Sequence, residues 1–193
     1  FNQIFKEEII NLPPLKTINC HAGKLPFYRG RNILNWVLIN DEKEFGVTVH
    51  YIDKGIDTGD IILQDSFSIS DLDDYSTLLS RSYEACATLL FKSIQLIKNE
   101  NVKRIKQVDI HPTGFYCSSR KEGDEIIDWN QTSRELFNFI RSICKPGPSA
   151  LTFYNQQAIF INRSEIILDA PIYRGIPGTI LNSSKDSLIV KTA

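Results

Sequence analysis

Short apolar runs separated by polar turns occupy the first seventy positions of the chain. Residues 16–21 and 46–52 are rich in β-branched and aromatic side chains, so each run predicts a β-strand, and residues 61–64 open a third. Residues 32–40 carry apolar side chains at helical spacing, with Asn32 as the candidate N-cap. This order of strands, loops and helices predicts an α/β domain in which the strands of the sheet run parallel.

The strongest helical pattern lies in residues 74–98. Its large apolar positions follow one another at steps of three and four, which places them on one face of a helix and predicts that this face is buried. The face consists of Leu79, Tyr83, Cys86, Leu90, Ile94 and Ile97.

The pattern changes after about Val108. Thr132 and Glu135 have the spacing of a capping box, which predicts the start of a short helix. Only short β-rich runs follow from Ser149 onward, and this spacing suggests a small antiparallel barrel. We therefore divide the chain into an α/β domain, residues 1–112, and a C-terminal domain, residues 113–193, with a short helix and a small β-barrel.

Composition excludes several classes of protein. The 193 residues are 42% apolar and 23% charged, which is typical of a globular chain rather than a disordered one. The 22 basic and 23 acidic residues give a net charge of −1, which argues against bulk binding to nucleic acid or to an anionic membrane. The longest apolar runs are too short for a membrane span.

The four cysteines lack the spacing of a zinc site, so we expect no metal and reduced thiols in the cytoplasm. The chain contains no Met and begins with Phe1. We therefore expect its true N-terminus, and with it the first part of the α/β domain, to be missing.

Two features bring chemistry to the predicted α/β domain. Asn19 and His21 stand two apart at the end of a predicted strand, so their side chains share a face and could donate hydrogen bonds to a developing oxyanion. Asp57, close to two glycines in a tight loop, could raise the pKa of His21 and fix its tautomer. Taken alone, the first feature is better explained by hydrogen bonds that hold a loop, and the second by a turn-forming residue.

The combination of segments changes this balance. Four segments follow one another along the chain: Asn-Cys-His at 19–21, Leu-Pro-Phe-Tyr-Arg-Gly at 25–30, Gly-Val-Thr-Val-His at 46–50 and Asp-Thr-Gly-Asp-Ile-Ile at 57–62. Together they resemble the core of the formyltransferases that use N10-formyltetrahydrofolate. Residues 126–130, Ile-Ile-Asp-Trp-Asn, look like the start of the C-terminal region of the tRNA and sugar enzymes of that family.

The resemblance implies a Rossmann-like catalytic domain followed by a smaller barrel-like domain. It implies that Asn19, His21 and Asp57 are catalytic, stabilising a tetrahedral intermediate and moving protons while a formyl group passes from N10-formyltetrahydrofolate to an amine. No metal is implied. The residues of the implied pterin-binding loop are Asp53, Gly55, Ile56 and Asp57.

The acceptor is a separate question. Residues 22–36 look most like those of the nucleotide-sugar N-formyltransferases, which implies an acceptor such as a dTDP-4-amino-4,6-dideoxyhexose and a role in lipopolysaccharide O-antigen biosynthesis. Lys24, Arg29 and Arg31 could bind its diphosphate, or each could pair with a surface carboxylate. A methionyl-tRNA formyltransferase, a formyltetrahydrofolate hydrolase and a ligand-binding module without transfer activity remain as alternatives, and a homodimer is left open.

Overall fold

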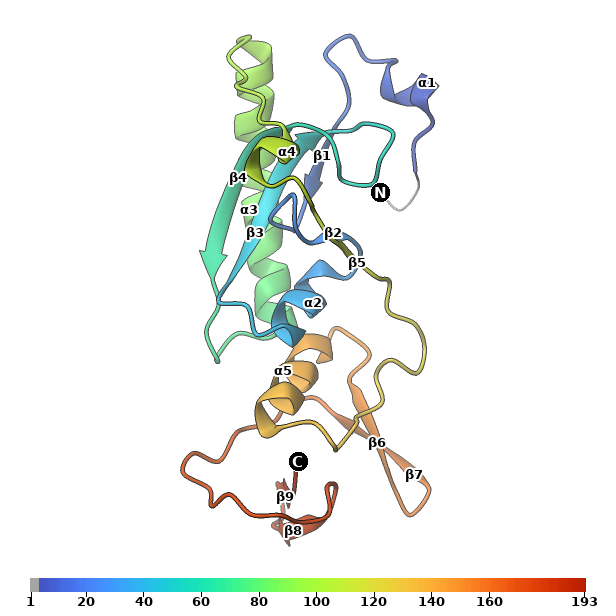
Figure 1. Ribbon diagram of the computed structural model, residues 1–193, viewed down its shortest axis with the longest axis vertical. Coiled ribbons are helices and arrows are strands. Elements are labelled where there is room, and N and C mark those ends of the chain that lie inside the picture. The colour runs from blue at the N-terminus through green and yellow to red at the C-terminus, as the bar shows by residue number, and fades with distance from the viewer. Residues whose placement is uncertain (1–3) are drawn as a thin grey trace.

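A three-stranded antiparallel sheet is the framework of the N-terminal part of the computed structural model, which describes residues 4–193 (Figure 1). Its strands are β1 (Ile18–His21), β3 (Glu44–Tyr51) and β4 (Ile61–Ser68), in the order β1-β3-β4. The expected α/β content is confirmed, but the expected parallel arrangement of the strands is wrong for this sheet, because both strand pairs are antiparallel. The loop 52–60 between β3 and β4 is shorter than the crossover that a parallel pair requires.

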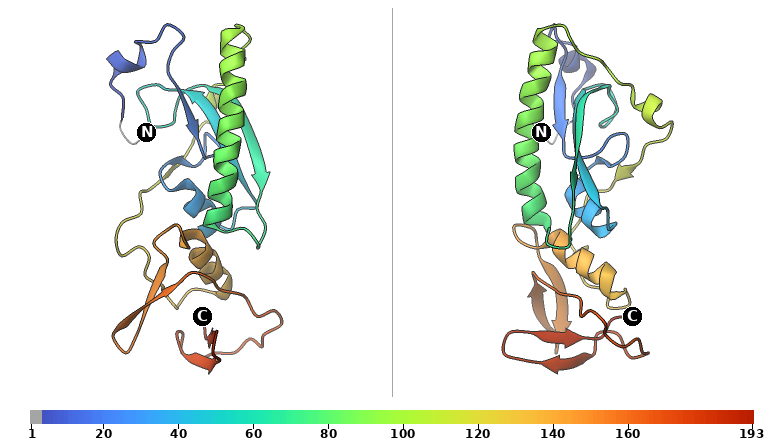
Figure 2. Two further views of the ribbon diagram at one scale, coloured as in Figure 1. Left: turned by 180° about the vertical axis from the view of Figure 1, so that it is seen from behind. Right: turned by 90° about the vertical axis from the view of Figure 1, so that its left-hand side faces the viewer.

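One long helix, α3 (Tyr75–Lys98), runs along one face of this sheet (Figure 2). It begins at a capping box in which the Asp74 side chain accepts a hydrogen bond from the Thr77 N–H and the Thr77 hydroxyl accepts one from the Asp74 N–H, both at 2.9 Å. The predicted buried face is confirmed in part, since Tyr83 is 65% and Ile94 47% exposed, while the other four residues are half-buried and pack against the core: Leu79, Cys86, Leu90 and Ile97. The buried side chains are Leu78, Ser82, Ala85, Leu89 and Ser93, and their small members let the helix lie close to the sheet.

The main core lies between the sheet, α3 and the short helix α2 (Ile33–Ile39). Leu38, Val47 and Leu78 are fully buried in it. Asn32 does not cap α2, because its backbone is left-handed at φ 55° and its side-chain oxygen instead accepts a hydrogen bond from the Arg120 N–H at 3.0 Å. The remaining small elements of this region are α1 (Glu7–Ile10), β2 (Arg29–Gly30), α4 (Gln107–Ile110) and β5 (Tyr116–Cys117), with β2 and β5 paired in parallel.

The C-terminal part is built on α5 (Ser133–Ile143), whose predicted capping box is confirmed by reciprocal hydrogen bonds between Thr132 and Glu135. The predicted barrel is not confirmed. Within the described residues, the strands of this part form two separate hairpins. Every residue of the strand at residues 180–183 is exposed, so that strand has no inward face for a barrel. The strands are β6 (Ala150–Tyr154), β7 (Gln157–Ile161), β8 (Ile180–Ser183) and β9 (Leu188–Val190).

Helix α5 joins the C-terminal part to the sheet region by packing against α2 (Figure 1). The buried Arg141 side chain crosses this junction and donates hydrogen bonds to the carbonyl oxygens of Ser70 and Asp73 at 2.8 and 3.0 Å. Arg134 forms ion pairs with Asp41 and Asp71 beside it. Among residues 4–193, no helix combines the length and apolar character needed to cross a bilayer.

Candidate active site

The end of β1 brings two of the predicted residues to one face of the sheet. Asn19 pairs with His50 and His21 with Thr48 in the antiparallel register of β1 and β3. The amide nitrogen of Asn19 lies 3.4 Å from Nε2 of His50, and the two imidazole rings meet edge to face with their centroids 6.5 Å apart. His21 and His50 are 8% and 2% exposed, so both rings are withdrawn from water.

Asp57 reaches this face from the loop between β3 and β4. Its backbone is left-handed at φ 53°, and its Oδ2 accepts a hydrogen bond from the Gly30 N–H at 2.9 Å. In this position Oδ2 lies 3.6 Å from Nδ1 of His21, and Oδ1 lies 3.5 Å from Nε2 of His50. The structure therefore places Asn19, His21 and Asp57 in one cluster, with His50 between the amide and the carboxylate.

The outer nitrogens of both rings are held by backbone carbonyls. Nε2 of His21 lies 2.7 Å from the Tyr28 oxygen, and Nδ1 of His50 lies 2.8 Å from the Tyr51 oxygen. Since a carbonyl only accepts, each of these ring nitrogens carries a proton. In the neutral His21 ring, Nδ1 is then the unprotonated nitrogen, and it faces Asp57.

Burial sets the protonation of His21. Burial lowers its pKa below the ordinary 6.5 and outweighs the Asp57 charge and the Tyr28 carbonyl, which both raise it. The expected net rise in the pKa of His21 is therefore wrong in sign, and Tyr28 rather than Asp57 sets the tautomer. Burial alone would raise the pKa of Asp57, but contacts with His50, His21 and the Gly30 N–H together hold it below its ordinary value. At neutral pH the cluster holds a neutral imidazole beside an ionised carboxylate.

Sequence reasoning missed two members of this arrangement. His50 belongs to the segment 46–50, to which the sequence analysis assigns no catalytic role. Its signal is the two-residue alternation of a strand, which places the His50 side chain on the same face as the side chain of Thr48. Gln107 had no such signal, because it stands 50 residues from Asp57 and contacts it only in the folded chain.

The residues of the predicted donor loop form a tight, self-bonded turn. Oδ1 of Asp53 accepts hydrogen bonds from the Gly55 N–H at 3.0 Å and from the Thr58 hydroxyl at 2.5 Å. A Cβ on Gly55 would stand 2.0 Å from that hydroxyl, so this turn requires glycine. Ile56 is 47% exposed at the tip, where it offers an apolar surface beside Asp57. The loop therefore presents an apolar tip on a turn that is held by its own hydrogen bonds.

All three predicted diphosphate ligands interact with other parts of the protein. Nζ of Lys24 pairs with a carboxylate oxygen of Glu44 on the surface. Nε and Nη2 of Arg29 donate to Oε1 of Gln107 at 3.0 and 2.6 Å, and the guanidinium lies 5.5 Å from the Tyr116 ring centroid. Arg31 is exposed next to β2. Lys24 and Arg29 contact different parts of the protein, so their present contacts do not bring them together at one point.

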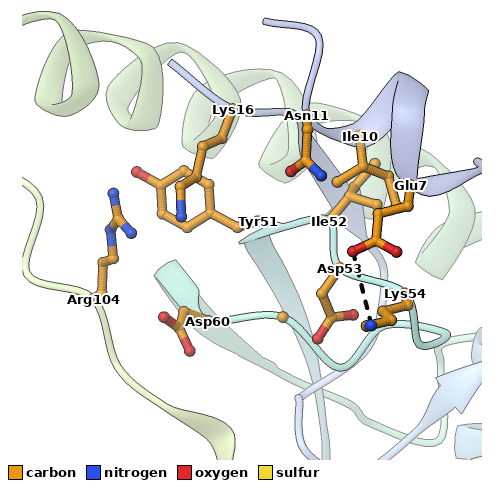
Figure 3. Close-up of a pocket in the computed structure, with 11 residues that line it drawn as sticks. Glu7, Ile10, Asn11, Lys16, Tyr51, Ile52, Asp53, Lys54, Asp60 and Arg104 are labelled. Atoms are coloured by element: carbon orange, nitrogen blue, oxygen red, sulfur yellow. Dashed lines mark ion pairs between the residues drawn. The ribbon is translucent and has the colours of Figure 1, made fainter. Parts of the chain in front are cut away.

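A pocket of about 300 Å³ adjoins the loop at the segment that precedes β1 (Figure 3). The Tyr51 ring forms one wall, with Nζ of Lys16 5.7 Å and the Arg104 guanidinium 4.5 Å from its centroid. Asp53 and Asp60 bring carboxylates to the same pocket. None of the candidate catalytic residues lines it, so this pocket is separate from the cluster and meets the donor loop only at the two ends of that loop.

Comparison with protein families matches both parts of the chain. A family model described as formyl transferase matches residues 1–94, and one described as formyl transferase, C-terminal domain, matches residues 120–193. The first contains Asn19, His21, His50 and Asp57, and the second contains α5 and all four C-terminal strands.

Individual relatives point to two kinds of acceptor. The methionyl-tRNA formyltransferase of Desulforamulus reducens is 34% identical over 196 residues, which cover all of this chain and 60% of the relative. The bifunctional polymyxin resistance protein ArnA of Wigglesworthia glossinidia brevipalpis is 37% identical over 94% of this chain and 27% of its own length. Among solved structures, the sugar 3N-formyl transferase WlaRD, crystallised with dTDP and 5-N-formyl-THF, is 30% identical with a TM-score of 0.77, over all of this chain and 66% of that one. The chain thus spans less than two thirds of these curated relatives.

Proposed function

The chain belongs to the formyltransferase family, and on that premise we propose that it transfers a formyl group from N10-formyltetrahydrofolate to the amine of a nucleotide-linked amino sugar. The observation that carries the proposal is the position of the Asp57 carboxylate between the facing nitrogens of His21 and His50, with the Asn19 amide at the same strand end. An amide donor, a neutral imidazole and a carboxylate together can bind a carbonyl oxygen and move a proton.

We assign the donor to the loop 53–59 and to the cluster beside it. Its pterin would rest on Ile56 and the backbone next to it, while its formyl group would face Asn19. When bound, it supplies an electrophilic carbonyl carbon attached to a nitrogen that leaves.

Asn19 is the group we assign to the carbonyl oxygen. One N–H of its amide is directed at His50, which orients the group, and the second N–H can donate to an oxygen that gains negative charge. A preorganised donor of this kind is worth about 10²–10³-fold in turnover.

His21 and Asp57 are the pair we assign to the proton. Nδ1 of the neutral ring can accept the proton that the attacking amine releases, and the imidazolium so formed would lie 3.6 Å from the Asp57 carboxylate. The same nitrogen can then return a proton to the leaving nitrogen. This assignment differs from a permanently charged His21, because burial favours the neutral ring before the reaction.

A nucleotide sugar is the acceptor we favour, with a dTDP-4-amino-4,6-dideoxyhexose as the first example to test. The likeness to a sugar 3N-formyl transferase over the whole chain supports it, as does the net charge of −1, which suits a small anionic ligand better than tRNA. Lys24, Arg29 and Arg31 remain our candidates for its diphosphate, with Lys24 leaving Glu44 on binding and Arg29 keeping its hydrogen bonds to Gln107. The four free cysteines suit the cytoplasm, and use of the product in lipopolysaccharide O-antigen stays a prediction.

Methionyl-tRNA is the second candidate acceptor, because methionyl-tRNA formyltransferases match this chain end to end at 34% identity. Mass spectrometry of reactions with the formyl donor and dTDP- or UDP-linked amino sugars, methionyl-tRNA or no acceptor separates the candidates. Formylated sugar supports the proposal, formylated tRNA replaces it, and release of formate without any acceptor indicates a hydrolase.

Substitutions of the cluster test the mechanism in the same assay. Asn19→Ala or His21→Ala should lower turnover by about 10²–10³-fold, while donor affinity, measured by fluorescence titration, should change far less because the loop 53–59 is intact. Near-normal turnover in His21→Ala would overturn the assignment of the proton.

A further inference from the structure

Gln107 lies beneath the loop that carries Asp57. It is the first residue of α4 and is 3% exposed. Its Nε2 donates hydrogen bonds to the carbonyl oxygens of Asp57 and Gly59, both at 2.8 Å. Its Oε1 accepts two hydrogen bonds from Arg29, at 3.0 and 2.6 Å. One buried amide therefore joins α4 to the loop on one side and to β2 on the other.

The hydrogen bonds of this amide are fully used. A glutamine side chain has two N–H donors and one oxygen with two lone pairs, and all four have partners here. A buried network in which every member is satisfied is rigid and costly to disturb. The Gln107 amide therefore favours one position of the two loop carbonyls over others.

The contacts bear directly on the candidate catalytic carboxylate. Asp57 has φ 53°, a conformation that a non-glycine residue keeps only when its surroundings hold it there. Gln107 holds its carbonyl from one side, and the Gly30 N–H holds its carboxylate from the other. Gly30 and Arg29 are the two residues of β2, so both restraints on Asp57 connect to the same strand.

We propose that Gln107 is a positioning residue that clamps the Asp57 backbone and so aims the Asp57 carboxylate at His21, with Arg29 as the anchor of the clamp. The expected change in kcat rests on the proposed function, whereas the clamp itself does not. It assigns Arg29 a place in the catalytic architecture that does not depend on a diphosphate.

The test uses two variants and readouts that do not need activity. Gln107→Met keeps the length of the side chain and removes all four hydrogen bonds, while Gln107→Glu keeps an acceptor for Arg29 and turns a second oxygen toward the two carbonyls. Gln95→Met and Gln95→Glu are matched controls, since Gln95 is exposed on α3. Circular dichroism confirms that each variant is folded.

Amide hydrogen exchange at Gly30 reports the carboxylate, because that N–H donates to Oδ2 of Asp57. We expect exchange about tenfold faster or more in both Gln107 variants and no change in the controls. NMR titration of the His21 ring, resolved among three histidines, should move to lower pH in Gln107→Met because the Asp57 charge raises the pKa of His21. Exchange and titration equal to wild type in a folded Gln107→Met, or unchanged exchange in Gln107→Glu if the Met variant does not fold, would overturn the proposal.

Kinetics give the functional arm. In a chain that transfers formyl, we expect kcat to fall about 10–100-fold in Gln107→Met, since the variant displaces the Asp57 carboxylate. A loss confined to the KM of a substrate would instead report the loop 53–59 or the released Arg29. If the wild-type chain transfers no formyl group, the proposed function fails, while exchange at Gly30 and titration of His21 still decide the clamp.

Discussion

Asn19 and His50 face each other across the β1–β3 pair, with the amide nitrogen of Asn19 3.4 Å from Nε2 of His50. The same ring nitrogen lies 3.5 Å from Oδ1 of Asp57. His50 therefore stands between the group we assign to the carbonyl oxygen and the carboxylate we assign to the proton. Its Nδ1–H is held by the Tyr51 carbonyl, so the ring cannot turn without losing a buried hydrogen bond.

His50→Phe should lower kcat of formyl transfer by about 10–100-fold. The variant keeps a ring in the core but removes the partner of both Asn19 and Asp57, and a hydrogen bond to a charged group is worth about 1.5–3 kcal/mol. Steady-state assays measure the effect. His111→Gln is the control, because His111 is exposed and its ring contacts only Thr113 and Phe27 among the described residues. Equal loss in both variants would contradict a specific role for His50.

Stability should fall as the pH drops below 6.5, the ordinary pKa of histidine. The folded state lowers the pKa of His21, so the unfolded chain binds more protons between that lowered value and 6.5, and unfolding becomes easier as the pH falls through this window. Asp57 adds nothing there, since its pKa is held below 3.8 when folded and its contribution is lost only in stronger acid.

Urea unfolding between about pH 7.5 and pH 5 measures this effect. His21→Gln should show a smaller loss of unfolding free energy over the same interval than wild type. A parallel pH dependence in the two proteins would mean that His21 is not the group responsible.

The elements with local causes could be predicted from the sequence. The capping box at Thr132 and the helix start at Asp74 have causes within four residues of chain, and both helices begin directly after those residues. The juxtaposition of His21 and Asp57 followed from the family resemblance, because the strand end and the glycine-flanked turn, each taken alone, did not indicate it.

Features that depend on the packing of distant segments could not be predicted in this way. The large apolar residues of α3 indicated the buried face only in part, because the most buried positions also include the small residues Ser82, Ala85 and Ser93. The pKa of His21 went the opposite way because burial, which no motif expresses, outweighs the neighbouring charge. Gln107 could not be identified from the sequence, because its hydrogen-bond partners lie 48 to 78 residues away along the chain.

Gly59→Ala should destabilise the chain by about 1–3 kcal/mol or more and impair the cluster. A Cβ at this position would stand 1.8 Å from the Tyr51 carbonyl oxygen, so either β3 or the loop must move. The same carbonyl holds the His50 ring. Chemical denaturation measures the change, with Gly175→Ala as the control because the nearest atoms to a Cβ there belong to the flexible Lys191 side chain, at 3.3 Å, and to the Tyr173 ring, at 3.5 Å. Similar stability of the two variants would show that the loop adapts freely.

Arg141→Met should destabilise the chain by about 3–5 kcal/mol without changing the pH titration of His21. Arg141 is 6% exposed, and its loss leaves the carbonyl oxygens of Ser70 and Asp73 without their donor at the junction of α5 with the sheet region. Arg163→Met is the matched control, because the Arg163 side chain is 84% exposed and pairs only with a surface carboxylate, so its removal should cost less than about 1 kcal/mol. Denaturant unfolding of the three proteins compares these values. A loss at Arg141 no larger than that at Arg163 would mean that apolar packing of α5 against α2, rather than this buried arginine, holds the two parts of the chain together.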